Sequence, residues 1–141
     1  MSLYCLVYTS IAKQKMSDDD LKDLLTKIRK KNETRQVTGM LLYLDPFFMQ
    51  VLEGEEAVLN ELFNLIKHDS RHHKISLIYK KPIEERYFSN WTMGFSKISH
   101  EDLVAIEGFS DFLQKPTPEF FSNSPNKVDE LLYKIKHEIL F

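Results

Sequence analysis

The sequence predicts one α+β domain with the element order β-α-β-β-α-β-β. Three observations predict it. Apolar runs rich in aromatic and β-branched residues recur over the N-terminal two thirds of the chain, as expected for buried strands. Two longer segments between these runs repeat their apolar residues at helical spacing. The length of 141 residues suits one domain, because domains usually contain about 100–200 residues.

The first strand and the first helix carry clear sequence signals. Residues 3–10, LYCLVYTS, are apolar and aromatic, which predicts a buried central strand. A helix is expected over residues 17–32, because Ser17 can cap its start and the aspartates that follow suit the positive end of the helix dipole. Basic residues gather at its end and Asn32 follows them, so we expect the helix to stop there.

A hairpin follows the first helix. Residues 37–44 and 47–54 read as two strands joined by the turn signal Asp45-Pro46. The remaining core elements are a second amphipathic helix and two more strands, expected at residues 55–69, 74–83 and 91–98. Split βαβ units in this order indicate a ferredoxin-like sheet with two helices on one face.

The chain changes character after about residue 98. A Pro- and Ser-rich connector precedes a final amphipathic helix that starts near residue 126. The sequence therefore divides into a core at residues 1–98 and a helical extension at residues 99–141. An extension of roughly 40 residues is too short to fold alone, so we expect it to pack on the sheet or on another chain.

Charge and composition exclude several classes of protein. The formal net charge is −2, which gives no overall attraction to nucleic acid or to an anionic membrane. The one cysteine, Cys5, cannot form an internal disulfide, and no apolar run reaches the roughly 18–20 residues of a transmembrane helix. The N-terminus shows no signal peptide. We expect a soluble cytoplasmic protein.

Two polar side chains within apolar strands carry the most information. Gln50 shares a strand face with Phe48 and Leu52, and an unpaired amide on a buried face costs about 1–3 kcal/mol. If the first and third strands are neighbours, the phenol of Tyr8 can reach this amide. The alternative is a structural tyrosine and a core amide bonded to backbone, and spacing alone favours that alternative.

Other motifs give little support to ordinary enzyme chemistry. His68 and His72 have a spacing that binds zinc on a helix, but no third ligand accompanies them, and we expect no metal. Arg71 beside His72 and His73 suits an anion such as phosphate. The chain has no Gly-rich phosphate loop, and Cys5 is expected to be buried and unreactive. RNA-stacking sheets share this topology, but their aromatic signature and basic residues are missing here.

Five stretches of the sequence form a joint pattern. They are SLYCLVYTS, KKNETRQVTGMLLY, FFMQVLEGEE, DSRHH and ERYFSNWTMGF. Together they resemble the BLUF family, blue-light sensors that use flavin, in that family's order and spacing over about residues 2–97. The resemblance extends more weakly to short BLUF proteins that end in two helices and carry no effector.

The resemblance implies a non-covalently bound flavin, FAD with FMN as the alternative. Tyr8 matches the tyrosine that donates an electron and a proton to the excited flavin, and Gln50 matches the glutamine between that tyrosine and the ring. Trp91 and Met93 match a switching Trp-x-Met segment on the last strand. The other residues that the resemblance implies as cofactor-binding are Leu24, Ile28, Asn32, Ile66, Arg71 and His72.

Two residues depart from the family pattern. Leu65 stands where some members have an arginine that contacts the flavin, and Lys31 precedes Asn32 where many members have Asn or His. These departures bear on phosphate contacts and on the type of flavin. They leave the Tyr8–Gln50 pair intact.

The resemblance implies a photoreceptor that signals by protein–protein contact, and not an enzyme. We expect a homo-oligomer with an unidentified protein partner, and neither nucleic acid nor membrane as a ligand. Two other classes stay open: a flavin-dependent redox enzyme with Tyr8 as donor, and a ferredoxin-like interaction module without cofactor. The sensor is favoured because a ring held between two helices leaves little room for a substrate, and no nicotinamide site is evident.

Overall fold

The computed structural model of the chain describes residues 2–44, 46–88 and 92–97. Its elements occur in the predicted order and confirm the α+β fold. They are β1 (Leu3–Ala12), α1 (Asp18–Arg35), β2 (Thr38–Leu44), β3 (Phe47–Glu55), α2 (Glu56–Lys67), β4 (His72–Pro82) and β5 (Gly94–Lys97). The predicted extension at residues 99–141, and Trp91, lie outside the described residues.

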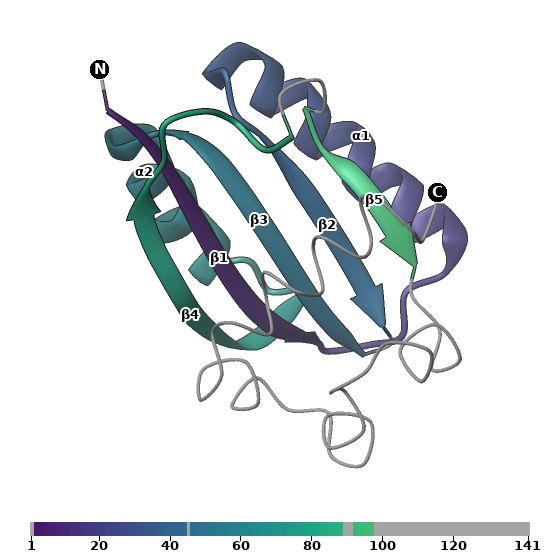
Figure 1. Cartoon of the computed structure of the whole chain (residues 1–141). Coiled ribbons are helices and arrows are strands. Elements are labelled where there is room, and N and C mark those ends of the chain that lie inside the picture. Colours follow the sequence, from purple (N-terminus) through teal and green to yellow (C-terminus); the bar gives the residue numbers. More distant parts are fainter. Residues whose placement is uncertain (1, 45, 89–91, 98–141) are drawn as a thin grey trace, which may run out of the picture.

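The strands form one sheet in the order β4-β1-β3-β2-β5, with α1 and α2 both on the same side of it (Figure 1). β1 pairs antiparallel with β3 and β4, and β3 pairs antiparallel with β2, as in a ferredoxin-like sheet. β5 adds to the edge of β2 in parallel. The antiparallel register of the two central strands places Tyr8 opposite Gln50.

The first helix begins where the sequence predicts and ends later. Ser17 accepts a hydrogen bond from the backbone N–H of Asp20, whose side chain accepts in return from the N–H of Ser17, at 3.1 Å each. The predicted end at Asn32 is wrong, because nothing in the next three residues breaks the helix. The chain turns only at Gln36, which adopts a left-handed conformation with φ 56° and donates its N–H to the last carbonyls.

The strand bounds also differ from those predicted. β1 continues for two more residues because Ile11 pairs with Phe47, and the N–H of Ala12 donates to the carbonyl of Pro46 at 2.8 Å. β4 begins earlier, at His72, which pairs with Ala12. β5 begins only at Gly94, and the two described residues before it accept hydrogen bonds from side chains of α1 instead.

The main core lies between the sheet and the helices. Its buried residues from the sheet are Leu6, Tyr8, Leu41, Tyr43, Phe48 and Leu52, and α1 and α2 add Leu21, Leu25 and Leu59. Gly39 permits the close approach of β2 to β3, because a Cβ at this position would lie 1.9 Å from the carbonyl oxygen of Val51. The sheet residues thus form a floor under two helices.

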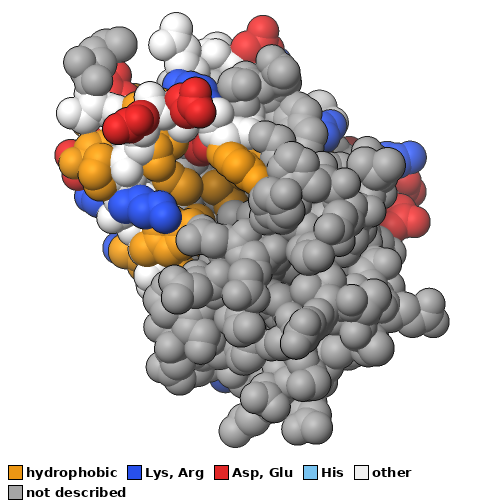
Figure 2. Space-filling model, viewed as in Figure 1, with side chains coloured by type: hydrophobic (Ala, Val, Ile, Leu, Met, Phe, Trp, Pro, Cys, Tyr) orange, Lys and Arg blue, Asp and Glu red, His pale blue; other side chains and the backbone are white. Residues whose placement is uncertain are grey.

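The opposite face of the sheet is also buried at its centre. Val7, Met40 and Val51 are at most 1% exposed there. Over the β4–β1 side of this face, hydrophobic side chains gather with charged ones among them (Figure 2). Within the described residues, no helix has the length and hydrophobicity needed to cross a membrane.

Candidate functional site

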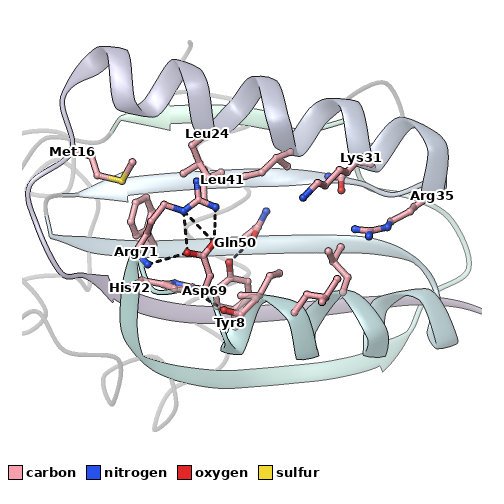
Figure 3. A pocket seen from close by; sticks show the side chains of 16 residues that line it. Tyr8, Met16, Leu24, Lys31, Arg35, Leu41, Gln50, Asp69, Arg71 and His72 are labelled. Atoms are coloured by element: carbon pink, nitrogen blue, oxygen red, sulfur yellow. Dashed lines mark hydrogen bonds and ion pairs between the residues drawn. The ribbon is translucent and has the colours of Figure 1, made fainter.

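A cavity of about 240 Å³ opens between the two helices above the floor of the sheet (Figure 3). Leu24 and Ile28 of α1 form one apolar wall, and Leu62 and Ile66 of α2 form the other. Its remaining lining includes polar residues from both helices, the sheet and the α2–β4 turn: Tyr8, Lys31, Asn32, Arg35, Gln50, Asp69, Arg71 and His72. Every residue that the sequence analysis expects to bind the cofactor therefore lines one cavity.

Tyr8, Gln50 and Met93 form a chain of hydrogen bonds at the floor of the cavity. The phenol of Tyr8 donates to Oε1 of Gln50, and Nε2 of Gln50 donates to Sδ of Met93 at 3.6 Å. All three side chains are buried. The expected contact between Tyr8 and Gln50 is confirmed. Because a thioether is a weak acceptor, the amide of Gln50 has one strong partner and one partner that is easily replaced.

The surroundings of Tyr8 keep its phenol protonated. Burial raises the pKa of Tyr8 well above its ordinary value, the negative charge of Asp69 raises it further, and the positive charge of Arg71 opposes both. The Tyr8 ring packs against Phe63, with ring centroids 5.6 Å apart. Tyr8 is therefore fixed in place as a hydrogen-bond donor.

Asp69 and Arg71 form an ion pair toward one end of the cavity (Figure 3). Nε of Arg71 donates to both carboxylate oxygens of Asp69, at 3.0 and 3.1 Å, and the backbone N–H of Arg71 donates at 2.9 Å. This side-chain hydrogen bonding lowers the pKa of Asp69 to about 2. Asp69 was not predicted as a site residue from the sequence, although it stands two residues before Arg71, which was.

His72 closes the same end from β4. Its Nε2 lies 2.8 Å from the carbonyl oxygen of Ile66, which can only accept, so this nitrogen carries the proton. Its Nδ1 then accepts from the hydroxyl of Ser10 at 2.7 Å. His68 ends α2 and contacts the carbonyl of Asn64, so the two histidines do not share a helix as a zinc pair would. The described residues contain no cluster of three metal-ligating side chains.

Known proteins can now be compared with this geometry. The sequence pattern described as "BLUF: Sensors of blue-light using FAD" matches residues 3–94. The chain belongs to the BLUF family. The matched residues form a BLUF domain, which senses blue light with a flavin.

Solved BLUF structures resemble the whole described fold. The dark-state structure of the BLUF protein BlrB is 30% identical, with a TM-score of 0.76, and the match covers 95% of each chain. The photo-activated state of BlsA is 35% identical, with a TM-score of 0.67, over 79% of this chain and 77% of that one.

Longer proteins share the BLUF region. Photoactivated adenylate cyclase subunit beta of Euglena gracilis is 30% identical over 122 residues, which are 86% of this chain and 14% of that protein. A bacterial light-regulated adenylyl cyclase structure is 26% identical, with a TM-score of 0.66, over 94% of this chain and 36% of that one. The chain thus spans a small part of the cyclases it matches.

The cavity fits a flavin ring. Two apolar walls from facing helices suit the faces of a flat aromatic ring, and amide and guanidinium groups at the edges suit its carbonyls and ring nitrogens. The volume of about 240 Å³ lies a little below the roughly 300–1,000 Å³ of sites that enclose a whole ligand. The cavity would therefore hold the ring of a flavin but not its whole tail.

Asn32 both lines the cavity and contacts the segment before β5. Its side chain is 2% exposed, lines the cavity, and donates from Nδ2 to the carbonyl oxygen of Thr92 at 2.9 Å. Nε of Arg29, one turn earlier on α1, donates to the carbonyl oxygen of Met93 at 2.8 Å. The last turns of α1 thus hold the segment before β5 beside the cavity. The sequence analysis did not identify Arg29, whose partner is distant in sequence.

A second buried polar cluster lies beyond Gln50 on the same strand. The carboxylate of Glu53 is 1% exposed and accepts from the hydroxyl of Thr38 at 2.9 Å and the backbone N–H groups of Tyr87 and Phe88 at 2.7 and 3.0 Å. Arg86 donates to the carbonyl oxygens of Glu53 and Gln36, at 2.9 and 2.7 Å. The cluster fixes the loop that leads toward β5. Glu53, like Gln50, is a polar residue in an apolar strand, so the same sequence pattern predicts that it has buried hydrogen-bond partners.

Proposed function

We propose that this chain is a blue-light photoreceptor whose switch is the buried chain of Tyr8, Gln50 and Met93. One observation carries the proposal. Gln50 sits between a phenol that donates strongly and a thioether that accepts weakly, on the floor of a cavity suited to a flat ring. An amide in this position can exchange its weaker partner at small cost.

The protein contributes positions and protons to the photochemistry. A bound flavin supplies the absorption of blue light and the redox chemistry that follows. Tyr8 holds a proton at its phenolic oxygen and donates it in a hydrogen bond to Oε1 of Gln50. With a flavin bound, rotation or tautomerisation of Gln50 would replace its hydrogen bond to Met93 by one to a ring carbonyl. Both arrangements satisfy the amide, as a two-state switch requires.

The ring is oriented by the surrounding side chains. Leu24 and Ile28 would cover one face of a bound ring and Ile66 the other, and Asn32 would bond to its polar edge. Arg71 and His72 would contact the side chain of the ring. A cavity of about 240 Å³ leaves little room for a second substrate beside the ring. This favours the sensor over a flavin-dependent redox enzyme.

For the cofactor we propose FAD, with FMN as the alternative. The ring cavity meets a second cavity of about 480 Å³, and the two share Met16, Leu24 and Arg71. The second cavity is lined by Lys13, Lys15, Lys27 and Arg71, which suit the phosphates of a flavin tail, and by the carboxylates of Asp20 and Asp23, which oppose them. The cations outnumber the carboxylates, so the lining is compatible with the phosphate of FMN and with the two phosphates of FAD.

The signal is proposed to leave through the segment before β5. Arg29 and Asn32 hold the carbonyls of Met93 and Thr92, and Gln50 holds the sulfur of Met93. A rearranged Gln50 releases one of these three contacts and shifts the edge strand. We propose a protein partner or a second copy of the chain as receiver of that shift, with the chain acting by contact and not by catalytic turnover.

The test is an absorption spectrum of the purified protein before, during and after blue light. A yellow protein whose flavin band shifts to the red and recovers in the dark supports the photoreceptor. A colourless protein that binds no added flavin overturns it and supports a cofactor-free interaction module. A flavoprotein that oxidises a nicotinamide without any dark-recovering shift supports the redox enzyme.

A further inference from the structure

One buried donor atom of a half-buried cation at the cavity has no hydrogen-bond partner. Three buried side-chain atoms in the described part of the chain lack a hydrogen bond: Oγ1 of Thr9, Nδ1 of His73 and Nη1 of Arg35. Of these three residues, only Arg35 lines the cavity between the helices. It stands on the last turn of α1, and its guanidinium is directed toward the cavity (Figure 3).

An arginine donor removed from water and left without an acceptor is unfavourable. The cost of an unsatisfied buried donor is about 1–3 kcal/mol, and it is greater for a charged group. Nη1 of Arg35 therefore requires an acceptor, and none of the residues that the structure describes provides one. A donor of this kind in the lining of a cavity points to a ligand.

The charges around the cavity show which acceptor is missing. Asp69 is the one carboxylate of the lining, and it is bonded to Arg71 toward the opposite end (Figure 3). Near Arg35 the other charged side chain is Lys31, which lies one turn earlier on the same helix. The lining residues of α2 are the apolar Leu62, Leu65 and Ile66, which carry no charge. This end has two cations and no anion from the described lining.

We propose that Arg35 is a cofactor-binding residue whose guanidinium donates to a carbonyl oxygen on the polar edge of the flavin ring. The inference rests on the flavin site proposed above. Arg35 follows Asn32 by three residues, so the two side chains share one face of α1 and reach the same edge of a ring. A planar guanidinium suits a carbonyl that lies in the plane of the ring.

The decisive variant is Arg35→Met, which keeps the apolar stem and removes every donor. The apoprotein is titrated with riboflavin in the dark, because riboflavin has the ring and no phosphate. We expect the Kd to rise about tenfold or more, as for the loss of one hydrogen bond to a charged group. The melting temperature of the apoprotein is expected to stay equal or to rise, because a buried donor atom without an acceptor has been removed.

Lys30→Met is the matched control. It removes the same charge from the same helix, but Lys30 is exposed and does not line the cavity. We expect its Kd for riboflavin to change less than about twofold. Equal weakening by both variants would mean general electrostatic attraction and would overturn the proposal. Arg35→Gln, which keeps N–H donors without the charge, is expected to bind between wild type and Arg35→Met.

Two further measurements separate the outcomes. The infrared carbonyl band of bound riboflavin is expected to shift to higher frequency in Arg35→Met, because a hydrogen bond to that carbonyl is lost. An Arg35→Met variant that binds riboflavin like wild type but FAD more weakly would assign Arg35 to the phosphates and overturn the ring contact. If wild type itself binds no flavin, the proposed photoreceptor fails at that step. A flavin-binding wild type and an unaffected Arg35→Met overturn only the role of Arg35.

Discussion

Gln50 and Glu53 are two buried polar residues on one strand, three positions apart, and the sheet separates them. Gln50 faces the helices and the cavity, with Tyr8 as its strong partner and the sulfur of Met93 at 3.6 Å as its weak one. Glu53 is on the opposite face, where three donors hold its carboxylate at 2.7–3.0 Å. Both are nearly inaccessible, at 3% and 1% exposure.

These hydrogen bonds show that Gln50 can change partners, whereas Glu53 holds a fixed structure. A fully satisfied carboxylate has no competing arrangement, so Glu53 stabilises a single position of the loop after β4. An amide with one weak partner has a second arrangement of similar energy as soon as a ligand offers an acceptor. The same strand thus carries the switch on one face and its rigid support on the other.

The largest effect is expected from removing the switch. Gln50→Leu has a similar shape and no hydrogen-bonding capacity, so it should keep bound flavin and lose the light-induced red shift entirely. Its free energy of unfolding should fall by about 1–3 kcal/mol, because the buried phenol of Tyr8 loses its acceptor. Absorption spectroscopy and denaturant unfolding measure the two properties. Tyr8→Phe is the companion variant, and it should likewise bind flavin without the shift. A normal photocycle in either variant would contradict the proposed switch.

Removing the rigid support should act on stability instead. Glu53→Ala leaves the N–H groups of Tyr87 and Phe88 and the hydroxyl of Thr38 without their acceptor. We expect the free energy of unfolding to fall by about 2–4 kcal/mol, since each lost partner of a buried donor is costly. Thermal and denaturant unfolding of the apoprotein measure this. Glu53→Gln, which keeps one acceptor oxygen, should lose less. A loss no greater than that of Gln50→Leu would remove the distinction between the two residues.

A smaller effect is expected at Asn32, which lines the cavity and also contacts the segment before β5. Asn32→Ala removes the hydrogen bond to Thr92 and a polar group at the cavity. Stability should fall by about 1 kcal/mol at most, because alanine is the better helix former. The Kd for flavin should rise severalfold. Thr34→Ala is the matched control, since its hydroxyl donates to the carbonyl of Lys31 on the exposed side of the same turn. A flavin affinity that is the same in both variants would limit Asn32 to its contact with Thr92.

How far the sequence predicts this site depends on how local each contact is. Strand periodicity places Tyr8 and Gln50 on the same face of the sheet if β1 and β3 are neighbours. The structure confirms that these strands pair and that the two side chains are in contact. The end of α1 could not be predicted, because Gln36 takes the left-handed position that Asn32 was expected to mark. The partners of Arg29 and Arg86 are 64 and 33 residues away, and no sequence pattern encodes such contacts.

The smallest effect is expected from pH, and its near absence is informative. Burial raises the pKa of Tyr8, so the phenol stays protonated well beyond the ordinary value of about 10. The amplitude of the red shift should therefore be constant from about pH 6 to about pH 9. Asp69 does not titrate there, because its pKa is lowered to about 2 by Arg71.

Above about pH 10 the unfolded chain loses its tyrosine proton before folded Tyr8 does, so stability should decrease as pH rises through that region. Comparing alkaline unfolding of wild type with Tyr8→Phe isolates this contribution, which the variant lacks. The outcome that contradicts the argument is a step in red-shift amplitude near neutral pH. Such a step would mean that a group other than Tyr8 or Asp69 controls the switch, and the hydrogen bond from the Tyr8 phenol to Gln50 would then not be its basis.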